Sequence, residues 1–314
     1  MLFEFDNEKY VENYNLNKNY GLGYVGSKNL IVEKLVKSFP NADNFYDLFA
    51  GGGSVTHYAI IAKKYKNYYM NDLDPQPIEL FKKALNGDFK NENRWISRED
   101  FFKLKDSDAY VAYCWSFGND GKTYLYGKEI EPYKKACYYA IAFDDWKLLE
   151  ELCPEVVDDA KKALLGVTYL KLRRLRFGNI LKKKISLGQL QNLLNLERLY
   201  NIERLGQLQR VINFSNKSYD EIKIKENSVI YCDIPYKDTV NKYKFGNFDY
   251  CKFYEWCRKQ TEPLFISSYD LPADRFFCVK EFEKNCTLQS GGNNKKIEKL
   301  YIPKHQTYDC GGLF

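Results

Sequence analysis

Asp233-Ile234-Pro235-Tyr236 is the first stretch whose residue types could do chemistry. It follows a short apolar run, residues 228–232, that predicts a buried strand. In an open α/β sheet, ligands bind beyond the carboxyl ends of the strands. A carboxylate, a rigid turn and an aromatic ring at such an end suit a nucleobase, because a ring stacks on a flat heterocycle for roughly 1–3 kcal/mol. Alternatively, Asp233 caps a helix or pairs with Lys237.

A glycine turn near the N-terminus is the second such stretch. Residues 45–49 are mostly apolar and predict a strand, Gly51 and Gly53 follow, and a helical pattern opens at Ser54. This order is typical of nucleotide- or nucleoside-binding α/β units, in which glycine lets a ligand approach the backbone. The spacing nearly matches the dinucleotide fingerprint but has Thr56 where that pattern has its third glycine or alanine. An ordinary βαβ turn without a ligand is the alternative.

Two further segments extend the prediction of a nucleoside site. Residues 68–72 read as a second strand that ends in Asp72, about 20 residues after the glycine turn, where a ribose diol is usually held. Gly26, Ser27 and Lys28 form another glycine turn, and Ser27 could cap a helix that runs to Pro40. A lysine at such a turn is suited to a small anion.

The α/β pattern is interrupted once. It returns after residue 212, with a strand at 263–268 and a possible antiparallel pair at 276–283 and 299–303. We therefore expect one α/β domain, residues 20–86 and 213–314, with residues 87–212 inserted into it.

A basic cluster lies within the insertion. Between Lys171 and Lys184 there are seven cations in 14 residues, and no acid occurs from Lys161 to Lys184. Such a cluster favours a polyanion, although a solvated helix face is the common alternative. The residues concerned are Lys171, Arg173, Arg174, Arg176, Lys182, Lys183 and Lys184.

Two other parts of the insertion leave alternatives open. The loop at residues 115–124 mixes glycine, polar and aromatic residues, and either inserts among bases or forms a plain hairpin. Apolar residues recur every third position from Leu187 to Val211, a period that spirals around an α-helix. A broken helix or one buried on all sides is expected, with a 3₁₀-helix or a solenoid as alternatives.

Composition excludes several classes of protein. Hydrophobic residues make up 45% and aromatic residues 17%, and no run of 18 apolar residues predicts a membrane span. The N-terminus lacks the pattern of a signal peptide. None of the nine cysteines forms a Cys-x-x-Cys pair, so we expect reduced thiols and no metal site.

The order of these motifs resembles the Dam-like (D12, α-group) adenine-N6-specific DNA methyltransferases, and most of all their phage-encoded members. The resemblance covers residues 20–86 and 212–303 and is weak across the insertion. It implies a class I S-adenosylmethionine-dependent methyltransferase fold, a Rossmann-like mixed sheet with helices on both faces. The insertion would be a mostly helical DNA-recognition domain. The activity implied is methylation of N6 of a flipped-out adenine.

The resemblance also implies residue roles. Asp233 and the Ile234 carbonyl would accept the hydrogens of the target amino group, and Tyr236 would stack on the adenine beside Pro235. The family usually has proline where this chain has Ile234, which puts full activity in question. The residues implied for the cofactor S-adenosylmethionine are Tyr24, Gly26, Lys28, Asp47, Phe49, Gly51, Gly53, Asp72, Tyr219 and Asp233.

Function and setting follow from the same resemblance. We expect an enzyme that needs no metal and acts on DNA in the cytoplasm of a bacterial host, with a monomer as the working assumption and a place in restriction–modification. A DNA-binding protein with a methylase fold and lost catalysis is the first alternative. A nicotinamide-dependent oxidoreductase is the second, but it leaves Asp233–Tyr236 unexplained. Methylation of cytosine N4 or of RNA is a lesser variant.

Overall fold

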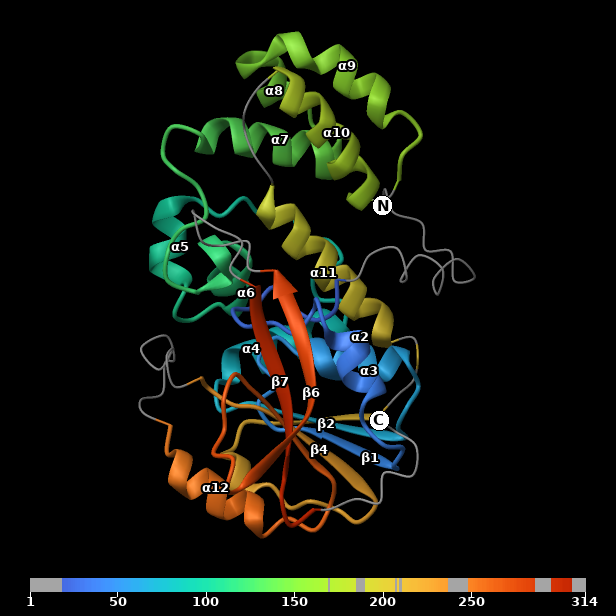
Figure 1. Cartoon of the computed structure of the whole chain (residues 1–314). Helices are drawn as coiled ribbons and strands as arrows, with labels where there is room; N and C mark the ends of the chain where they lie inside the picture. Colours follow the sequence, from blue (N-terminus) through green and yellow to red (C-terminus); the bar gives the residue numbers. More distant parts are fainter. Residues whose placement is uncertain are drawn as a thin grey trace. The chain divides into compact units, whose positions relative to one another are not determined.

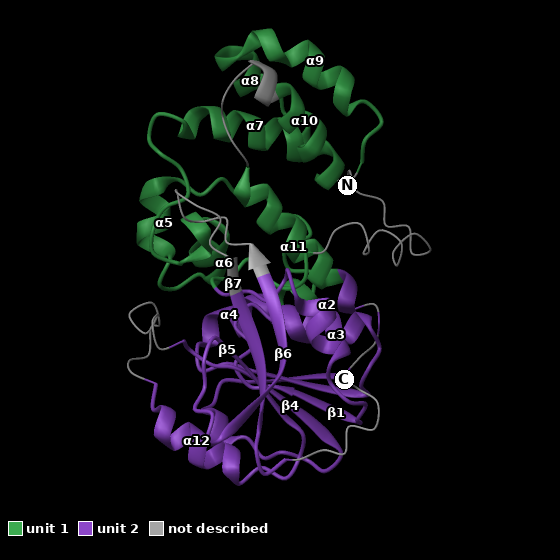
Figure 2. Cartoon of the chain, viewed as in Figure 1, with its two compact units in different colours: residues 1–25, 83–203 green, residues 26–82, 204–314 purple. Residues whose placement is uncertain are grey.

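The computed structural model describes residues 19–168, 170–184, 190–206, 208, 211–236, 248–285 and 295–306. The chain divides into two compact units (Figure 2). Unit 1 contains Lys83–Glu203 with the segment that ends at Val25, and unit 2 contains Gly26–Lys82 and Arg204–Phe314. The sequence analysis instead placed the boundaries at 86/87 and 212/213 and gave residues 20–25 to the α/β part.

Unit 2 is built on a seven-stranded mixed sheet (Figure 1). The strands are β1 (Asn44–Asp47), β2 (Asn67–Asn71), β3 (Val211–Ser215), β4 (Ser228–Asp233), β5 (Leu264–Ser268), β6 (Phe276–Asn285) and β7 (Lys295–Pro303). Their order in the sheet is β3-β2-β1-β4-β5-β7-β6. The first five run parallel, whereas β7 is antiparallel to both β5 and β6, so the expected antiparallel pair is confirmed.

The buried strands explain why the sequence showed apolar runs rather than alternation. All four residues of β1 and all five of β5 are buried, as expected for parallel strands covered on both faces. One face packs in an aromatic and aliphatic cluster that includes Tyr46, Ile230, Ile234 and Phe253. The helical segments of unit 2 are α2 (Val32–Lys37), α3 (Ser54–Ile61), α4 (Pro75–Leu85, which reaches into unit 1), η2 (Tyr219–Glu221) and α12 (Tyr250–Arg258).

Unit 1 is helical in the part that the structure describes. Its helices are α5 (Arg98–Leu104), α6 (Ala109–Cys114), η1 (Phe117–Asn119), α7 (Glu131–Phe143), α8 (Lys147–Leu152), α9 (Pro154–Leu164), α10 (Leu170–Lys184) and α11 (Gln191–Gly206). Helices α7 to α10 pack on one another (Figure 1). No helix in the described residues is both long enough and apolar enough to cross a bilayer.

Most of the leucine repeat lies in one helix, α11. Leu190, Leu193, Leu196, Leu199, Ile202 and Leu205 are all buried, with at most 5% of each side chain exposed. Because a three-residue step moves around the helix axis, this pattern buries α11 on several sides. The expectation of a helix buried on several sides is confirmed for the residues of α11, where the 3₁₀-helix and the solenoid are wrong, but the helix ends at Gly206 and the last residue of the repeat, Val211, is exposed and begins β3. Leu187 lies outside the described residues.

The loop at 115–124 closes on itself. Ser116 and Tyr124 form an isolated antiparallel bridge, and Asn119 Nδ2 donates to the Tyr113 carbonyl. Gly118 and Asn119 both have positive φ, which fits the glycine and asparagine found there. The loop is therefore a short, tightly turned hairpin that presents Phe117, whose side chain is 58% exposed.

Candidate active site

The two motifs that opened the sequence analysis meet at one edge of the sheet. Strands β1 and β4 are parallel neighbours, and β2 continues the sheet on the other side of β1. The order of the strands therefore reverses between β1 and β4, and ligands of open α/β sheets bind at such a point. The glycine turn follows β1 and Asp233 ends β4, so the structure brings these predicted residues together.

Asp47, the last residue of β1, is hydrogen-bonded to the first turn of α3, on the far side of the glycine turn. Its side chain is 1% exposed, and Oδ2 accepts a hydrogen bond from the Thr56 hydroxyl at 2.8 Å. Its Oδ1 is buried and makes no hydrogen bond with the described residues. Burial raises the pKa of Asp47 to about 7, although the Thr56 bond acts in the opposite direction. The site thus holds a carboxylate with one acceptor still available.

Asp72 holds the backbone of the same turn. Its Oδ2 accepts from the Gly51 N–H at 2.7 Å, and its Oδ1 accepts from the Asp74 N–H at 2.9 Å. Burial raises its pKa to about 6, and these two hydrogen bonds limit the rise. Asp72 therefore shapes the glycine turn, a role that the sequence analysis did not include.

Gly53 is required for two separate reasons. Its φ of +69° lies in the left-handed region that favours glycine. A Cβ atom there would also lie 2.5 Å from Met70 Cε and 2.9 Å from Phe81 Cε2. The turn is thus constrained by the packing of β2 and α4 as well as by access for a ligand.

Lys28 is the buried centre of the site, with 2% of its side chain exposed. It forms ion pairs with Asp233 Oδ2 and with Glu298 Oε1, the latter at 3.0 Å. Its Nζ also donates to the Tyr236 hydroxyl at 2.9 Å and to the Gly26 carbonyl at 3.2 Å. Burial lowers the pKa of Lys28, but the two carboxylates outweigh burial and hold the pKa above its usual value.

Tyr236 turns its hydroxyl toward the two carboxylates. The hydroxyl lies 2.9 Å from Glu298 Oε1 and 3.3 Å from Asp233 Oδ1. The centroid of the Tyr236 ring lies 4.4 Å from that of Tyr269 and 5.3 Å from Lys28 Nζ. Burial, followed by the charges of Asp233 and Glu298, raises the pKa of Tyr236, so the phenol keeps its proton.

The turn between Asp233 and Tyr236 is held from both sides. Ile234 is 1% exposed and packs in the main cluster of the sheet, which explains an aliphatic residue at this position. The Pro235 carbonyl accepts a hydrogen bond from the Tyr250 hydroxyl at 2.8 Å. Burial of Ile234 and this hydrogen bond therefore hold the turn in place.

An aromatic group borders the glycine turn. Phe49 stacks on Tyr219 with ring centroids 5.5 Å apart, and both rings contact Phe248 and Phe253. Tyr219 is 8% exposed. Phe49 and Tyr219, two residues predicted to line the cofactor cleft, therefore lie together.

Tyr24 belongs to the other unit. Its ring packs on Tyr113 at 5.4 Å, within unit 1, whereas Gly26 and Lys28 belong to unit 2. The structure therefore groups Gly26 and Lys28 with Asp233 in unit 2, and it describes Tyr24 with unit 1.

The basic cluster differs from its prediction as a set of phosphate contacts. Arg173 is 5% exposed and pairs with Asp144, and it also donates to backbone carbonyls that include Val167 at 3.0 Å. Arg174 pairs with the buried Glu197 at 2.9 Å. Asp144 directly follows α7 and Glu197 lies in α11, so the absence of acids within residues 161–184 was misleading. Arg173 and Arg174 stabilise unit 1.

The residues after Arg174 that were predicted to contact phosphate are not in buried ion pairs among the described side chains. Arg176 is exposed, and its Nη1 donates to the Ala163 carbonyl at 3.1 Å. Lys182, Lys183 and Lys184 lie in the last turn of α10, and their side chains are outside the described residues.

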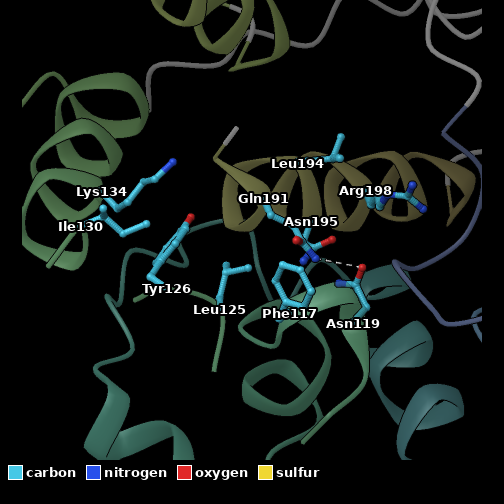
Figure 3. Close-up of a pocket in the computed structure, with 10 residues that line it drawn as sticks. All are labelled: Phe117, Asn119, Leu125, Tyr126, Ile130, Lys134, Gln191, Leu194, Asn195 and Arg198. Atoms are coloured by element: carbon cyan, nitrogen blue, oxygen red, sulfur yellow. Dashed lines mark hydrogen bonds between the residues drawn. The ribbon is translucent and has the colours of Figure 1, made fainter. Parts of the chain in front are cut away.

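Unit 1 contains a pocket of about 490 Å³ between α11, α7 and the loop that presents Phe117 (Figure 3). Its lining includes two cations, three amides and no acid: Phe117, Asn119, Leu125, Tyr126, Ile130, Lys134, Gln191, Leu194, Asn195 and Arg198. Gln191 Nε2 donates to Asn119 Oδ1 at 3.2 Å, and Arg198 Nη1 donates to the Leu22 carbonyl at 3.0 Å. Arg198 Nε is buried and without a hydrogen bond among the described residues.

Sequence reasoning missed Glu298, Tyr269 and the pocket in unit 1. A signal for Glu298 was present, because Glu298, Leu300 and Ile302 alternate along β7 and are all buried. An acid on the apolar face of a strand indicates a partner inside the protein. The pocket had no such signal, since its residues come from segments far apart in the chain.

The fold and this site define an α/β protein with the class I S-adenosylmethionine-dependent methyltransferase architecture. Residues 24–149 match the family described as D12 class N6 adenine-specific DNA methyltransferase. This match covers less than half of the chain, and it supports the function predicted from the sequence, DNA adenine-N6 methylation. The matched segment includes the glycine turn and Asp72 and ends before Asp233. It does not favour the nicotinamide alternative. A comparison with curated proteins gave no match.

Proposed function

We propose that the chain uses S-adenosylmethionine to methylate N6 of an adenine flipped out of DNA, with Asp233 as the residue that accepts hydrogen from the target amine. The observation that carries this proposal is the position of Asp233 at the end of β4, next to the glycine turn that follows β1. The Asp233 side chain is 21% exposed, so it is reachable for a substrate although Lys28 holds one of its oxygens.

The residues around the glycine turn fit the proposed cofactor. Gly51 and Gly53 have positive φ, and Asp47 offers a buried oxygen without a hydrogen bond among the described residues, as a ligand ammonium group requires. Phe49 and Tyr219 would border the adenine ring, and Asp72 would bind the ribose hydroxyls. Gly26 and Lys28 would lie toward the methionine end, and Tyr24 is retained as a further candidate. When bound, S-adenosylmethionine supplies a methyl group activated by a sulfonium.

The protein's own contribution is hydrogen bonding and alignment. The lone pair of the adenine amino group is delocalised into the purine ring, which makes the amine a weak nucleophile. Asp233 and the Ile234 carbonyl, by accepting its two hydrogens, would draw that lone pair out of conjugation. Tyr236, with Pro235 beside it, would hold the base. Fixing the reacting groups in line can supply several kcal/mol through proximity.

Unit 1 is proposed to bind the DNA. The pocket in Figure 3 offers amides that match base edges, an exposed phenylalanine that can stack, and cations without a lining acid. Arg176 and Lys182–Lys184 would add phosphate contacts. The loop at 115–124 is a hairpin, and its exposed Phe117 would insert among bases.

The subtype and setting are part of the same proposal. The order of the glycine turn, Asp72, the insertion and Asp233–Tyr236 supports a Dam-like (α-group), phage-encoded type. A monomer acting in the bacterial cytoplasm, within restriction–modification, is the setting that such a type implies.

The test is transfer of labelled methyl from S-adenosylmethionine to unmethylated DNA, followed by nucleoside analysis. The wild type should produce N6-methyladenine, and Asp233→Ala should abolish transfer while still binding the cofactor, because Glu298 remains as a partner for Lys28. Asp43→Ala is the matched control, since Asp43 is an exposed acid of unit 2 in an ion pair with Lys66. Undiminished transfer by Asp233→Ala would refute the assignment. DNA and cofactor binding without transfer by the wild type would favour the non-catalytic alternative.

A further inference from the structure

Glu298 is a second carboxylate in the site, besides Asp233. It lies on β7, and none of its side chain is exposed. Its Oε1 contacts both Lys28 Nζ at 3.0 Å and the Tyr236 hydroxyl at 2.9 Å. A fully buried carboxylate is costly to maintain, so contacts with two groups of the active site indicate a role there.

The hydroxyl of Tyr236 has one proton and two carboxylates within reach. Glu298 Oε1 is the nearer acceptor at 2.9 Å, and Asp233 Oδ1 is 3.3 Å away. Lys28 Nζ donates to the oxygen of the same hydroxyl at 2.9 Å. The shorter distance favours donation to Glu298 over donation to Asp233 Oδ1.

The three N–H groups of Lys28 are shared in a similar way. Asp233, Glu298, the Gly26 carbonyl and the Tyr236 oxygen all lie within bonding reach of Nζ. Because Glu298 carries part of the neutralisation of Lys28, Asp233 is not the sole counter-ion. A carboxylate that is less engaged by its own protein is a better acceptor for a substrate hydrogen.

We propose that Glu298 is a positioning residue that takes the Tyr236 proton and part of the Lys28 charge, so that Asp233 keeps an acceptor for the target amino group. This inference rests on the proposed role of Asp233. The contacts on which it depends, those of Glu298 with Lys28 and Tyr236, are all within the chain. Without the charge on Glu298, the hydroxyl proton and Lys28 would both turn toward Asp233.

The first test is Glu298→Gln, which keeps the size of the side chain and removes its charge. We expect kcat for methyl transfer to fall roughly tenfold or more, because a charge-assisted acceptor is lost. The KM for DNA and the Kd for S-adenosylmethionine should change by no more than about twofold, a split that general loss of structure would not give. Glu197→Gln is the matched control, a buried glutamate of unit 1 paired with Arg174.

The second test uses Tyr236→Phe, which keeps the ring and removes the contested proton. Since Glu298 already takes this proton and the ring that would hold the base remains, Tyr236→Phe should lower kcat by clearly less than tenfold. Adding Glu298→Gln to Tyr236→Phe should then cost much less than Glu298→Gln costs alone, because the proton that would block Asp233 is absent. Tyr236→Phe gives an answer even if Glu298→Gln does not fold.

Three results would overturn the inference. They are an unchanged kcat in Glu298→Gln, a loss of about tenfold or more in Tyr236→Phe, or equal effects of Glu298→Gln in both backgrounds. Absence of methyl transfer by the wild type is a different outcome, because it refutes the proposed function before Glu298 is tested.

Discussion

Asp47 is an acid buried where little compensates its charge. One oxygen accepts from Thr56, the other makes no hydrogen bond with the described residues, and burial raises the pKa to about 7. A raised pKa means that the folded state holds the proton more tightly than the unfolded chain does. The contribution of Asp47 to stability is therefore present at low pH and is lost as the pH rises from about 4 to about 7.

Asp47→Asn should remove this pH dependence. The asparagine oxygen can still accept from Thr56, so the variant should gain stability relative to wild type by roughly 1–3 kcal/mol between about pH 5 and pH 8. The free energy of unfolding in urea, measured without cofactor at both pH values, checks the gain. Asp274→Asn, at an aspartate whose side chain is 77% exposed, should show no such trend. Equal pH dependence in wild type and Asp47→Asn would contradict the prediction.

The elements around the glycine turn explain why it tolerates so little change. Gly53→Ala would add a methyl group at a φ of +69°, against Met70 and Phe81. We expect a loss of about 2–4 kcal/mol, from backbone strain plus overpacking. Gly166→Ala, at a φ of +71° with no atom within 4 Å of the added carbon, should show only the backbone strain, about 1–2 kcal/mol. Thermal unfolding of both variants separates the two contributions, and equal losses would show that packing does not matter.

The loop that presents Phe117 is the element through which the pocket of unit 1 can be tested. Phe117→Ala should weaken DNA binding roughly tenfold, because a stacking ring is removed without disturbing the core. Phe102→Ala is the matched control, since Phe102 is 51% exposed in the same unit and does not line the pocket. Titration of labelled DNA at fixed salt gives both affinities. Equal affinities would exclude the pocket from DNA binding.

These elements also show what could be predicted from the sequence. The strand that ends at Asp233 and the turn at Gly51–Gly53 were recognisable because each is encoded by consecutive residues. The contacts that Glu298 and Tyr269 make with Tyr236 were not, because they join residues far apart in the chain.

The surroundings of Arg173 could not be predicted for the same reason. Its charge was visible in the sequence, but its partner Asp144 comes from another part of unit 1. Local patterns therefore specified the elements and the residues at their ends, whereas long-range pairing decided which charges are buried.

The net charge of the whole chain is +6, too small to explain DNA binding without local concentration. The basic segment of α10 supplies that concentration only in part, because Arg173 and Arg174 are paired inside unit 1. Arg176 and Lys182–Lys184 are the cations of the segment that we propose to contact phosphate, whereas Lys171 lies near Glu197. Neutralising all four should reduce the slope of log affinity against log salt by about 3 to 4.

The measurement is DNA affinity at several salt concentrations, for the wild type and for a variant with these four residues changed to glutamine. Arg173→Gln separates the two kinds of cation, because it removes a buried guanidinium that donates to three backbone carbonyls, and it should lower the free energy of unfolding by about 3–5 kcal/mol. The fourfold variant should unfold like the wild type, since surface charges contribute little to stability. An unchanged salt slope in the fourfold variant would mean that other residues of the protein contact the DNA phosphates. The pocket of unit 1 would then be the place to search for those contacts.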